Sequence, residues 1–221
     1  MLSATEVDKL RTQLYSAVLS DVLDQLGYRN QAMRPFVRPL DERHVVFGPA
    51  RTGMYMSAVF DPHDTHPYNI EIALIDDLGP GDVVVLGCNG PTDTIGPWGE
   101  LLTTAAQQRG AAGCVTDGLV RDVRQIREMK FPVFHGGIGP LDTKGRARMV
   151  ERDVPVECAG AAVRPGDIVF GDVDGVVVIP REREEEVIRL ALEKVSGENQ
   201  SRDALRRGEL LGAVFARLGI L

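Results

Sequence analysis

Residues 79–87 read Gly-Pro-Gly-Asp-Val-Val-Val-Leu-Gly, a Pro-Gly turn followed at once by a short apolar run rich in valine. This order predicts a tight turn that starts a buried strand. The same pattern of a Pro-Gly turn and an apolar run is repeated at residues 164–171, which read Arg-Pro-Gly-Asp-Ile-Val-Phe-Gly. The repeat is too short to indicate a duplicated domain, but it predicts two strands that begin in the same way.

Strands and helices alternate around these two turns. Apolar spacing predicts helices over 69–78, 101–109 and 123–129, and strands over 83–87, 113–116 and 131–134. The segment 154–179, rich in β-branched residues and glycine, predicts several strands and no helix. Another strand is expected over 45–60, with an interruption at Gly48 and Pro49. The alternation is typical of an α/β protein with a mixed sheet.

Both ends of the chain carry helical patterns. One helix is expected over 5–26, with Gly27 as its stop, so that residues 1–27 form an N-terminal helix. From Glu182 the pattern predicts a helix that ends at Gly197, a second helix over about 199–207 and a shorter third one. Residues 181–221 would form a helical C-terminal arm. Since no low-complexity linker divides the chain, residues 1–221 are expected to form a single domain.

The overall composition excludes several classes of protein. A chain of 221 residues with 43% hydrophobic residues can bury a full core, and its net charge of −7 argues against general binding of nucleic acid. No apolar run reaches the roughly 18–20 residues that a membrane span needs. The charged segment 1–12 lacks the apolar core of a signal peptide. We therefore expect a cytoplasmic protein without nucleic-acid or membrane partners.

The densest group of potentially functional residues lies at 96–122. A glycine-rich loop at 96–99 leads into a helix whose first amides lack partners inside the helix, which suits a bound carboxylate or phosphate. The next strand ends near residue 117, and Arg121 and Asp122 precede another helix. Both loops should open at the carboxyl ends of strands, where α/β proteins place ligands. An Arg-Asp pair there suits an anionic substrate held by a metal, although an Asp at a helix start is often only a cap.

These residues resemble a known family. Trp-Gly-Glu-Leu-Leu at 98–102, Arg-Gly-x-x-Gly at 109–113 and Asp-Gly-x-x-Arg-Asp at 117–122 are similar to the RraA-like proteins, and segments 131–134 and 165–180 also match. That family includes the divalent-metal-dependent 4-hydroxy-4-methyl-2-oxoglutarate / 4-carboxy-4-hydroxy-2-oxoadipate aldolases and RraA, a regulator of ribonuclease E. The resemblance implies an α/β/α sandwich of the swivelling β/β/α type. It also implies a homo-oligomer, a trimer or a dimer of trimers, with sites between subunits.

The resemblance implies a role for each matching residue. Asp122 would hold Mg²⁺ or Mn²⁺, with water and substrate filling the other positions. Arg121 would contact the keto oxygen of a small anionic 2-oxo acid and stabilise an enolate. Gly99 and the amides of Leu101 and Leu102 would bind the pyruvyl carboxylate.

Three further residues are assigned in the same way. Glu100, where the metal-dependent aldolases usually have Asp, would position a water for proton transfer. Glu198 corresponds to a glutamate that approaches the site from the C-terminal arm of a neighbouring subunit. Asn69 is a candidate substrate contact.

The expected activity is a metal-dependent aldolase that cleaves 4-hydroxy-2-oxo acids to pyruvate and a second oxo acid. Decarboxylation of oxaloacetate should follow, because it passes through the same pyruvate enolate. The alternatives are a non-enzymatic regulator that binds ribonuclease E, and a relative acting on another anionic substrate. The chain continues past Glu198 to Leu221, as the enzymes do, which favours the enzyme. A Schiff-base aldolase is disfavoured, since the lysines lie in polar or boundary contexts: Lys9, Lys130, Lys144 and Lys194.

Overall fold

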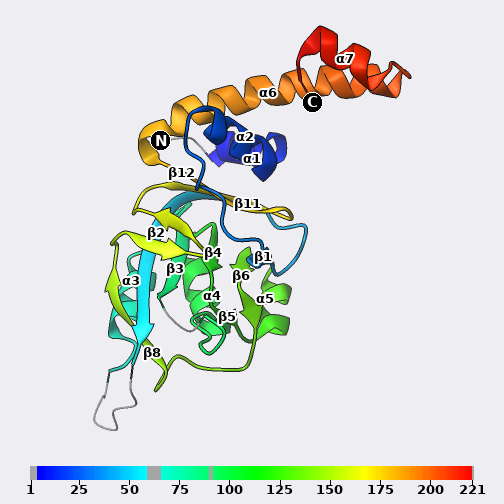
Figure 1. Ribbon diagram of the computed structural model, residues 1–221. Coiled ribbons are helices and arrows are strands. Elements are labelled where there is room, and N and C mark those ends of the chain that lie inside the picture. Colours follow the sequence, from blue (N-terminus) through cyan, green and yellow to red (C-terminus); the bar gives the residue numbers. More distant parts are fainter. Residues whose placement is uncertain (1–3, 59–65, 90–91, 221) are drawn as a thin grey trace.

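The computed structural model describes residues 4–58, 66–89 and 92–220, and helices and strands alternate through most of this range (Figure 1). The helices are α1 Ala4–Gln13, α2 Ser16–Gln25, α3 Asn69–Asp76, α4 Glu100–Gln108, α5 Val123–Met129, the 3-10 turn Arg181–Arg183, α6 Glu184–Arg206 and α7 Leu211–Leu218. The strands are β1 Arg38–Pro39, β2 Val46–Ser57, β3 Val83–Asn89, β4 Gly113–Thr116, β5 Leu119–Val120, β6 Val133–His135, β7 Gly137–Ile138, β8 Ala147–Arg152, β9 Val156–Cys158, β10 Ala161–Val163, β11 Ile168–Asp172 and β12 Gly175–Ile179.

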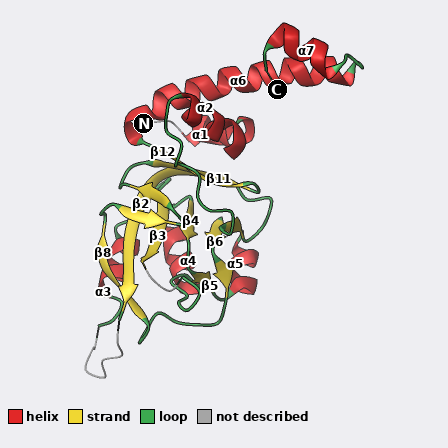
Figure 2. Cartoon of the chain, viewed as in Figure 1, coloured by secondary structure: helices red, strands yellow, loops and turns green. Residues whose placement is uncertain are grey.

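Within the described residues, an eight-stranded sheet runs in the order β1-β6-β4-β3-β2-β11-β12, with β8 also paired to β2. Strands β2, β3, β4 and β6 are parallel, whereas β11 is antiparallel to both of its neighbours, so the expected mixed sheet is confirmed. Alternate side chains of β3 face opposite layers. Val84 and Leu86 pack in the same cluster as helices α3, α4 and α5, and Val83 and Val85 pack with the β9–β10 hairpin. The β9–β10 hairpin thus packs on one face of the sheet, and helices α3, α4 and α5, which Figure 2 draws in red, pack on the other.

The two Pro-Gly-Asp turns are built alike, as their sequences predict. In the first, the amide of Gly79 donates to the carboxylate of Asp82 at 2.8 Å. In the second, the amide of Arg164 donates to Asp167, also at 2.8 Å. The glycine before each aspartate has a φ of +86°, in the left-handed region that favours glycine. Each turn therefore uses the same cap and the same backbone bend to start its strand.

The prediction of one helix over 5–26 is wrong at its centre. The chain is extended at Tyr15, with φ −146° and ψ 155°, and a new helix starts at Ser16. Asp172 in β11 holds this start, because it accepts hydrogen bonds from the amide of Ser16 at 2.8 Å and from its hydroxyl at 2.7 Å. The helical spacing of apolar residues continues across the break, so this spacing does not predict it. In the structure, the break coincides with the contact between Ser16 and the distant strand β11.

Two glycines that were expected to interrupt elements instead permit close contacts. Helix α6 continues through Gly197, where an added Cβ would lie 2.3 Å from Ile220, so the glycine makes room for the returning end of the chain. Strand β2 continues through Gly48, where a Cβ would lie 2.1 Å from the carbonyl oxygen of Gly81. The predicted helix boundary at Gly197 and the predicted interruption of β2 are therefore both wrong.

The helical ends of the chain lie together on one side of the sheet. Residues of α1, α2 and α6 share a buried cluster with β11 and β12, which includes Val18, Phe170 and Val187. Helix α7 packs against the far part of α6, away from α4 and β5 (Figure 1). The described residues contain no helix whose length and apolar content would let it span a membrane. The expected C-terminal helical arm is present, as α6 and α7.

Candidate active site

The two loops singled out from the sequence meet in the structure. The amide of Arg121 donates to the carbonyl oxygen of Trp98 at 3.0 Å. Next to it, Asp122 adopts a left-handed conformation, with φ 57°, immediately before α5. The Oδ2 atom of Asp122 accepts a hydrogen bond from the amide of Glu100, the first residue of α4, at 3.2 Å. The structure therefore brings Glu100, Arg121 and Asp122 together, as their positions at strand ends predict.

The absence of a side chain at Gly99 leaves room for Arg121 and Asp122. A Cβ at this position would lie 2.8 Å from Oδ2 of Asp122 and 3.3 Å from both Cγ and Nε of Arg121. The backbone φ of −152° is open to any residue, so the requirement for glycine here is one of space. The absence of a side chain lets the Arg-Asp pair lie directly against the start of α4.

The start of α4 is suited to an anion. Gly99 occupies the N-cap position without a side-chain hydrogen bond, and the amides of Leu101 and Leu102 donate to none of the described residues. Unpaired amides and the helix dipole together favour a negative group at this end of a helix. The side chain of Leu101 is 77% exposed, so the helix start is open to solvent. These features fit the expected carboxylate contact.

Arg121 lies between two carboxylates. Its Nε atom is 3.7 Å from Oδ2 of Asp122, and its Nη1 atom is 3.6 Å from Oδ1 of Asp142. Asp142, in the loop between β7 and β8, also accepts a hydrogen bond from the hydroxyl of Tyr68 at 2.7 Å. Sequence reasoning missed Tyr68 and Asp142. The one signal near either of them is that Tyr68 directly precedes Asn69, which was singled out.

Glu71 adds a second missed carboxyl group near Arg121. It lies in α3 and accepts a hydrogen bond from the hydroxyl of Tyr55, a fully buried residue of β2. Burial raises the pKa of Glu71 to about 7, the charge of Asp142 acts in the same direction, and the Tyr55 hydrogen bond and Arg121 act against them. A carboxyl group that titrates near neutral pH therefore lies within electrostatic range of the Arg121–Asp142 pair.

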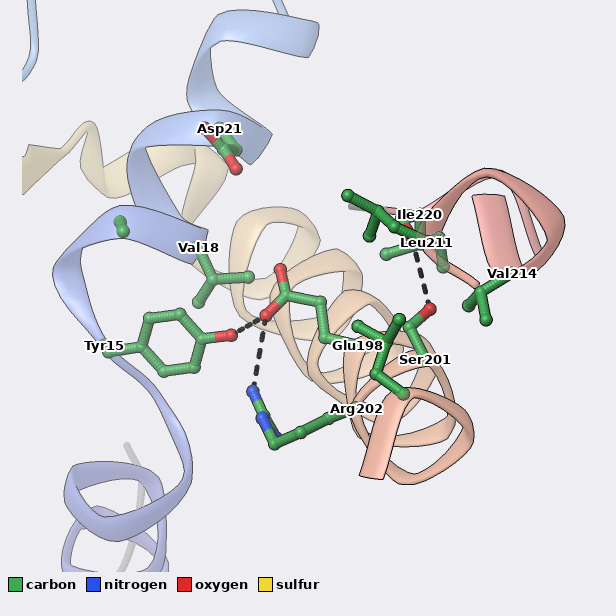
Figure 3. Close-up of a pocket in the computed structure, with 11 residues that line it drawn as sticks. Tyr15, Val18, Asp21, Glu198, Ser201, Arg202, Leu211, Val214 and Ile220 are labelled. Atoms are coloured by element: carbon green, nitrogen blue, oxygen red, sulfur yellow. Dashed lines mark hydrogen bonds and ion pairs between the residues drawn. The ribbon is translucent and has the colours of Figure 1, made fainter. Parts of the chain in front are cut away.

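The remaining predicted residues lie in different places. Asn69 begins α3 and is exposed, next to the tyrosine that contacts Asp142. The carboxylate of Glu100 accepts a hydrogen bond from the hydroxyl of Thr104 at 2.9 Å, one turn along α4. Glu198 lies on α6, where it contacts Tyr15 and Arg202 (Figure 3). Within one chain, α6 runs along the opposite side of the molecule from α4 and β5 (Figure 1), so Glu198 is not brought to this site.

The surroundings of Asp122 fit a divalent cation that keeps most of its water. Both contacts of Asp122 with described residues use Oδ2, and its side chain is 42% exposed, which leaves Oδ1 for a ligand. No group of three or more His, Cys, Asp or Glu side chains suited to a metal occurs in the described part of the chain. One carboxylate plus water suits Mg²⁺ or Mn²⁺, whereas a structural zinc site needs about four protein ligands.

A family model described as RraA-like: Aldolase/RraA matches residues 16–178, which include all of these loops. The chain belongs to the RraA-like family. A Halalkalibacterium halodurans protein named "Putative 4-hydroxy-4-methyl-2-oxoglutarate aldolase" is 34% identical over 197 residues, 87% of this chain and 86% of that protein. Protein DlpA of Legionella pneumophila is 33% identical over 196 residues, 89% of this chain but only 31% of DlpA.

A solved structure of the RraA-like family extends the likeness to the fold. RraAS2 of Streptomyces coelicolor, described as an unusual member of the RNase ES inhibitor RraA protein family, matches with a TM-score of 0.76 and 31% identity. The match covers 88% of this chain and 96% of RraAS2. The mixed α/β fold with C-terminal helices is therefore the RraA-like fold. The relatives that are named as aldolases suggest a lyase. RraAS2, in contrast, is described as a member of a family of ribonuclease inhibitors.

Proposed function

We propose that this chain is a divalent-metal-dependent lyase that cleaves 4-hydroxy-2-oxo acids of the 4-hydroxy-4-methyl-2-oxoglutarate type to pyruvate and a second oxo acid. The observation that carries the proposal is the meeting of Asp122 and Arg121 with the free amides at the start of α4. This arrangement places a carboxylate that can bind a cation, a fixed positive charge and backbone amides that can bind an anion next to one another. The relative of H. halodurans named as an aldolase supports the same activity.

Binding of the pyruvyl end follows from this geometry. The substrate carboxylate would meet the amides of Leu101 and Leu102, whose hydrogens have no partner among the described residues. Arg121 would donate a hydrogen bond to the keto oxygen next to that carboxylate. A divalent ion held by Asp122 would supply Lewis-acid stabilisation of the negative charge that develops on this oxygen.

The reaction then requires one bond cleavage and two proton transfers. The C4 hydroxyl gives its proton to the water that Glu100 orients, the C3–C4 bond breaks to leave a carbonyl group on C4, and the bonding electron pair becomes the pyruvate enolate. Arg121 stabilises the enolate oxygen because its positive charge is already in place. The same water, now carrying the extra proton, then gives a proton to C3, which completes pyruvate. With oxaloacetate the same C3–C4 bond breaks, CO₂ leaves, and the same enolate is protonated.

The proposal includes a homo-oligomer with its sites between subunits. Glu198 would approach the site of a neighbouring copy. In its own chain it lies on α6, which runs on the opposite side of the molecule from α4 and β5 (Figure 1). The C-terminal arm supports association because it exposes several large apolar side chains, and such clusters are typical of interaction surfaces. They are Leu205, Leu210, Leu211 and Phe215.

A pyruvate assay tests the proposed activity. The protein is incubated with oxaloacetate, or with a 4-hydroxy-2-oxo acid, in Mg²⁺ or in EDTA, and pyruvate is followed through lactate dehydrogenase. We expect pyruvate in Mg²⁺ and little in EDTA. Arg121→Ala and Asp122→Ala should abolish it, whereas Arg43→Ala, which removes an exposed arginine paired with Asp41, should not. Absence of metal-dependent pyruvate from every substrate would overturn the function, and full activity of both site variants would overturn the site.

The likeness to RraAS2 supports a second candidate, a protein regulator that binds ribonuclease E. Inhibition of purified ribonuclease E by this protein, measured on a model RNA, separates the two functions. A regulator would inhibit RNA cleavage without metal-dependent pyruvate formation, and the Asp122→Ala variant would inhibit as well as the wild type. The lyase proposal expects no inhibition at concentrations where pyruvate formation is readily measured.

A further inference from the structure

The two carboxylates beside Arg121 contact different nitrogens of the guanidinium group. Asp122 lies nearest Nε and Asp142 lies nearest Nη1, so Nη2 forms the closest approach of neither ion pair. A guanidinium group is planar and rigid, so two ion pairs at different nitrogens restrain both its position and its rotation. Nη2 is then the nitrogen that we expect to face a ligand.

Asp142 is itself held in place by two hydrogen bonds. Its Oδ2 accepts from the hydroxyl of Tyr68 at 2.7 Å, and its Oδ1 accepts from the amide of Thr143 at 2.8 Å. Thr143 is buried, so the backbone on this side of Asp142 is anchored in the protein. Burial raises the pKa of Asp142, but these hydrogen bonds and the charge of Arg121 outweigh it and hold the pKa below the ordinary value. Asp142 therefore stays ionised and oriented across the neutral pH range.

The contact joins three segments that are far apart in the sequence. Tyr68 precedes α3, Arg121 precedes α5, and Asp142 lies in the loop between β7 and β8. The side chains of Arg121 and Asp142 are 38% and 35% exposed, so their ion pair adds little to the stability of the fold. An exposed ion pair of this kind can still restrict the orientation of the guanidinium group.

We propose that Asp142, held by Tyr68, is the positioning residue that orients Arg121 for the reaction. The inference rests on the proposed lyase function, in which Arg121 stabilises the enolate oxygen. Asp142 does not touch the substrate in this scheme. It holds Nη1 so that Nη2 meets the keto oxygen, and Tyr68 keeps Asp142 from rotating away.

Kinetics of matched variants test the positioning role. Asp142→Asn should lower kcat for oxaloacetate by roughly ten- to a hundredfold while KM changes less than about threefold, because catalytic groups are sensitive to small displacements. Tyr68→Phe should lower kcat less, and the double variant should be no worse than Asp142→Asn, since both changes break one chain of contacts. Asp142→Glu, which keeps the charge, should recover part of kcat. The control is Asp41→Asn, which removes the carboxylate of another Asp-Arg pair and should leave kcat unchanged.

Crystal structures of the wild type and of Asp142→Asn give a readout that does not depend on turnover. The proposal expects the Arg121 guanidinium to rotate or become disordered in the variant, with Asp122 and the start of α4 unchanged. Unchanged kcat in Asp142→Asn, or an unchanged guanidinium together with a lowered kcat, would overturn the positioning role. If the wild type makes no pyruvate but the guanidinium still rotates in the variant, the lyase function fails and the positioning of Arg121 by Asp142 stands.

Discussion

The carboxylate of Asp122 accepts a hydrogen bond from the backbone amide of Glu100, with 3.2 Å between Oδ2 and the nitrogen. This bond ties the residue before α5 to the first residue of α4, although 21 residues of chain separate the two positions. The same carboxylate oxygen lies close to the Arg121 guanidinium. Any change that moves the start of α4 should therefore also move the cation ligand and the fixed positive charge of the site.

Gly99→Ala tests this coupling. The added methyl group would lie 2.8 Å from Oδ2 of Asp122, so the Arg-Asp pair must move away from α4. We expect pyruvate formation to fall by more than about tenfold, while overpacking costs about 1–3 kcal/mol of unfolding free energy and leaves the protein folded. Gly212→Ala is the matched control, because an added Cβ at Gly212 meets no atom within 4 Å. Full activity of Gly99→Ala, measured beside a normal circular dichroism spectrum, would show that the close approach is not needed.

The central part of the site could be predicted from the sequence because it follows from local rules. Arg121 and Asp122 follow the carboxyl end of β4 and precede a helix start, although the short strand β5 of a separate two-stranded sheet lies between. The glycine-rich loop before Glu100 likewise precedes a helix start. Tyr68 and Asp142 could not be predicted in this way. Their contact depends on the path of the loop between β7 and β8, and no spacing in the sequence encodes that path.

The errors in the predicted helices have the same origin. The apolar spacing of residues 5–26 is helical throughout, and the break at Tyr15 exists because Asp172, more than 150 residues away, binds Ser16. A glycine is typical of a helix end, yet Gly197 lies inside α6, where the lack of a side chain leaves room for Ile220. In both cases a contact between distant parts of the chain overrides a local signal.

Asp117→Ala should destabilise the fold. The buried carboxylate of Asp117 accepts hydrogen bonds from the amide of Cys88 at 2.8 Å and from the amide of Ala159 at 3.1 Å, and so links β3 to the β9–β10 hairpin. Its removal leaves two amides without partners, which should cost about 2–4 kcal/mol. Asp203→Ala, at an exposed ion pair on α6, should change the free energy of unfolding by less than about 0.5 kcal/mol. Urea unfolding of both variants makes the comparison, and equal midpoints would contradict the structural role of Asp117.

Glu71 should make stability depend on pH. Its pKa is raised from an ordinary value of 4.5 to about 7, chiefly by burial, so between these values the folded state binds more protons than the unfolded state. The free energy of unfolding should therefore lose a contribution of about 3 kcal/mol as the pH rises from about 4.5 through about 7. Glu71→Gln removes the titrating group and keeps its shape.

The measurement is the difference in unfolding free energy between wild type and Glu71→Gln at several pH values. We expect the unfolding free energy of the wild type to fall relative to that of Glu71→Gln as the pH rises across the window. The reason is that only the wild type must then bury a charge beside Tyr55. Other titrating groups are common to both proteins and cancel in the comparison. A difference that stays constant from pH 5 to pH 8 would mean that Glu71 titrates at its ordinary pKa.

Anion binding at the proposed site should depend on a divalent cation. Without one, the positive charge of Arg121 lies beside two negative carboxylates, Asp122 and Asp142, so the local field opposes an incoming anion. Oxalate resembles the pyruvate enolate and is a dianion. We expect it to bind at least about tenfold more tightly in Mg²⁺ than in EDTA, measured by calorimetry with correction for the Mg²⁺–oxalate complex in solution. Asp122→Ala should remove this dependence on Mg²⁺, whereas Asp41→Ala, at an ion pair with Arg43, should keep it. Equally tight binding of oxalate in EDTA would mean that the amides of α4 and Arg121 hold the anion without a cation at Asp122.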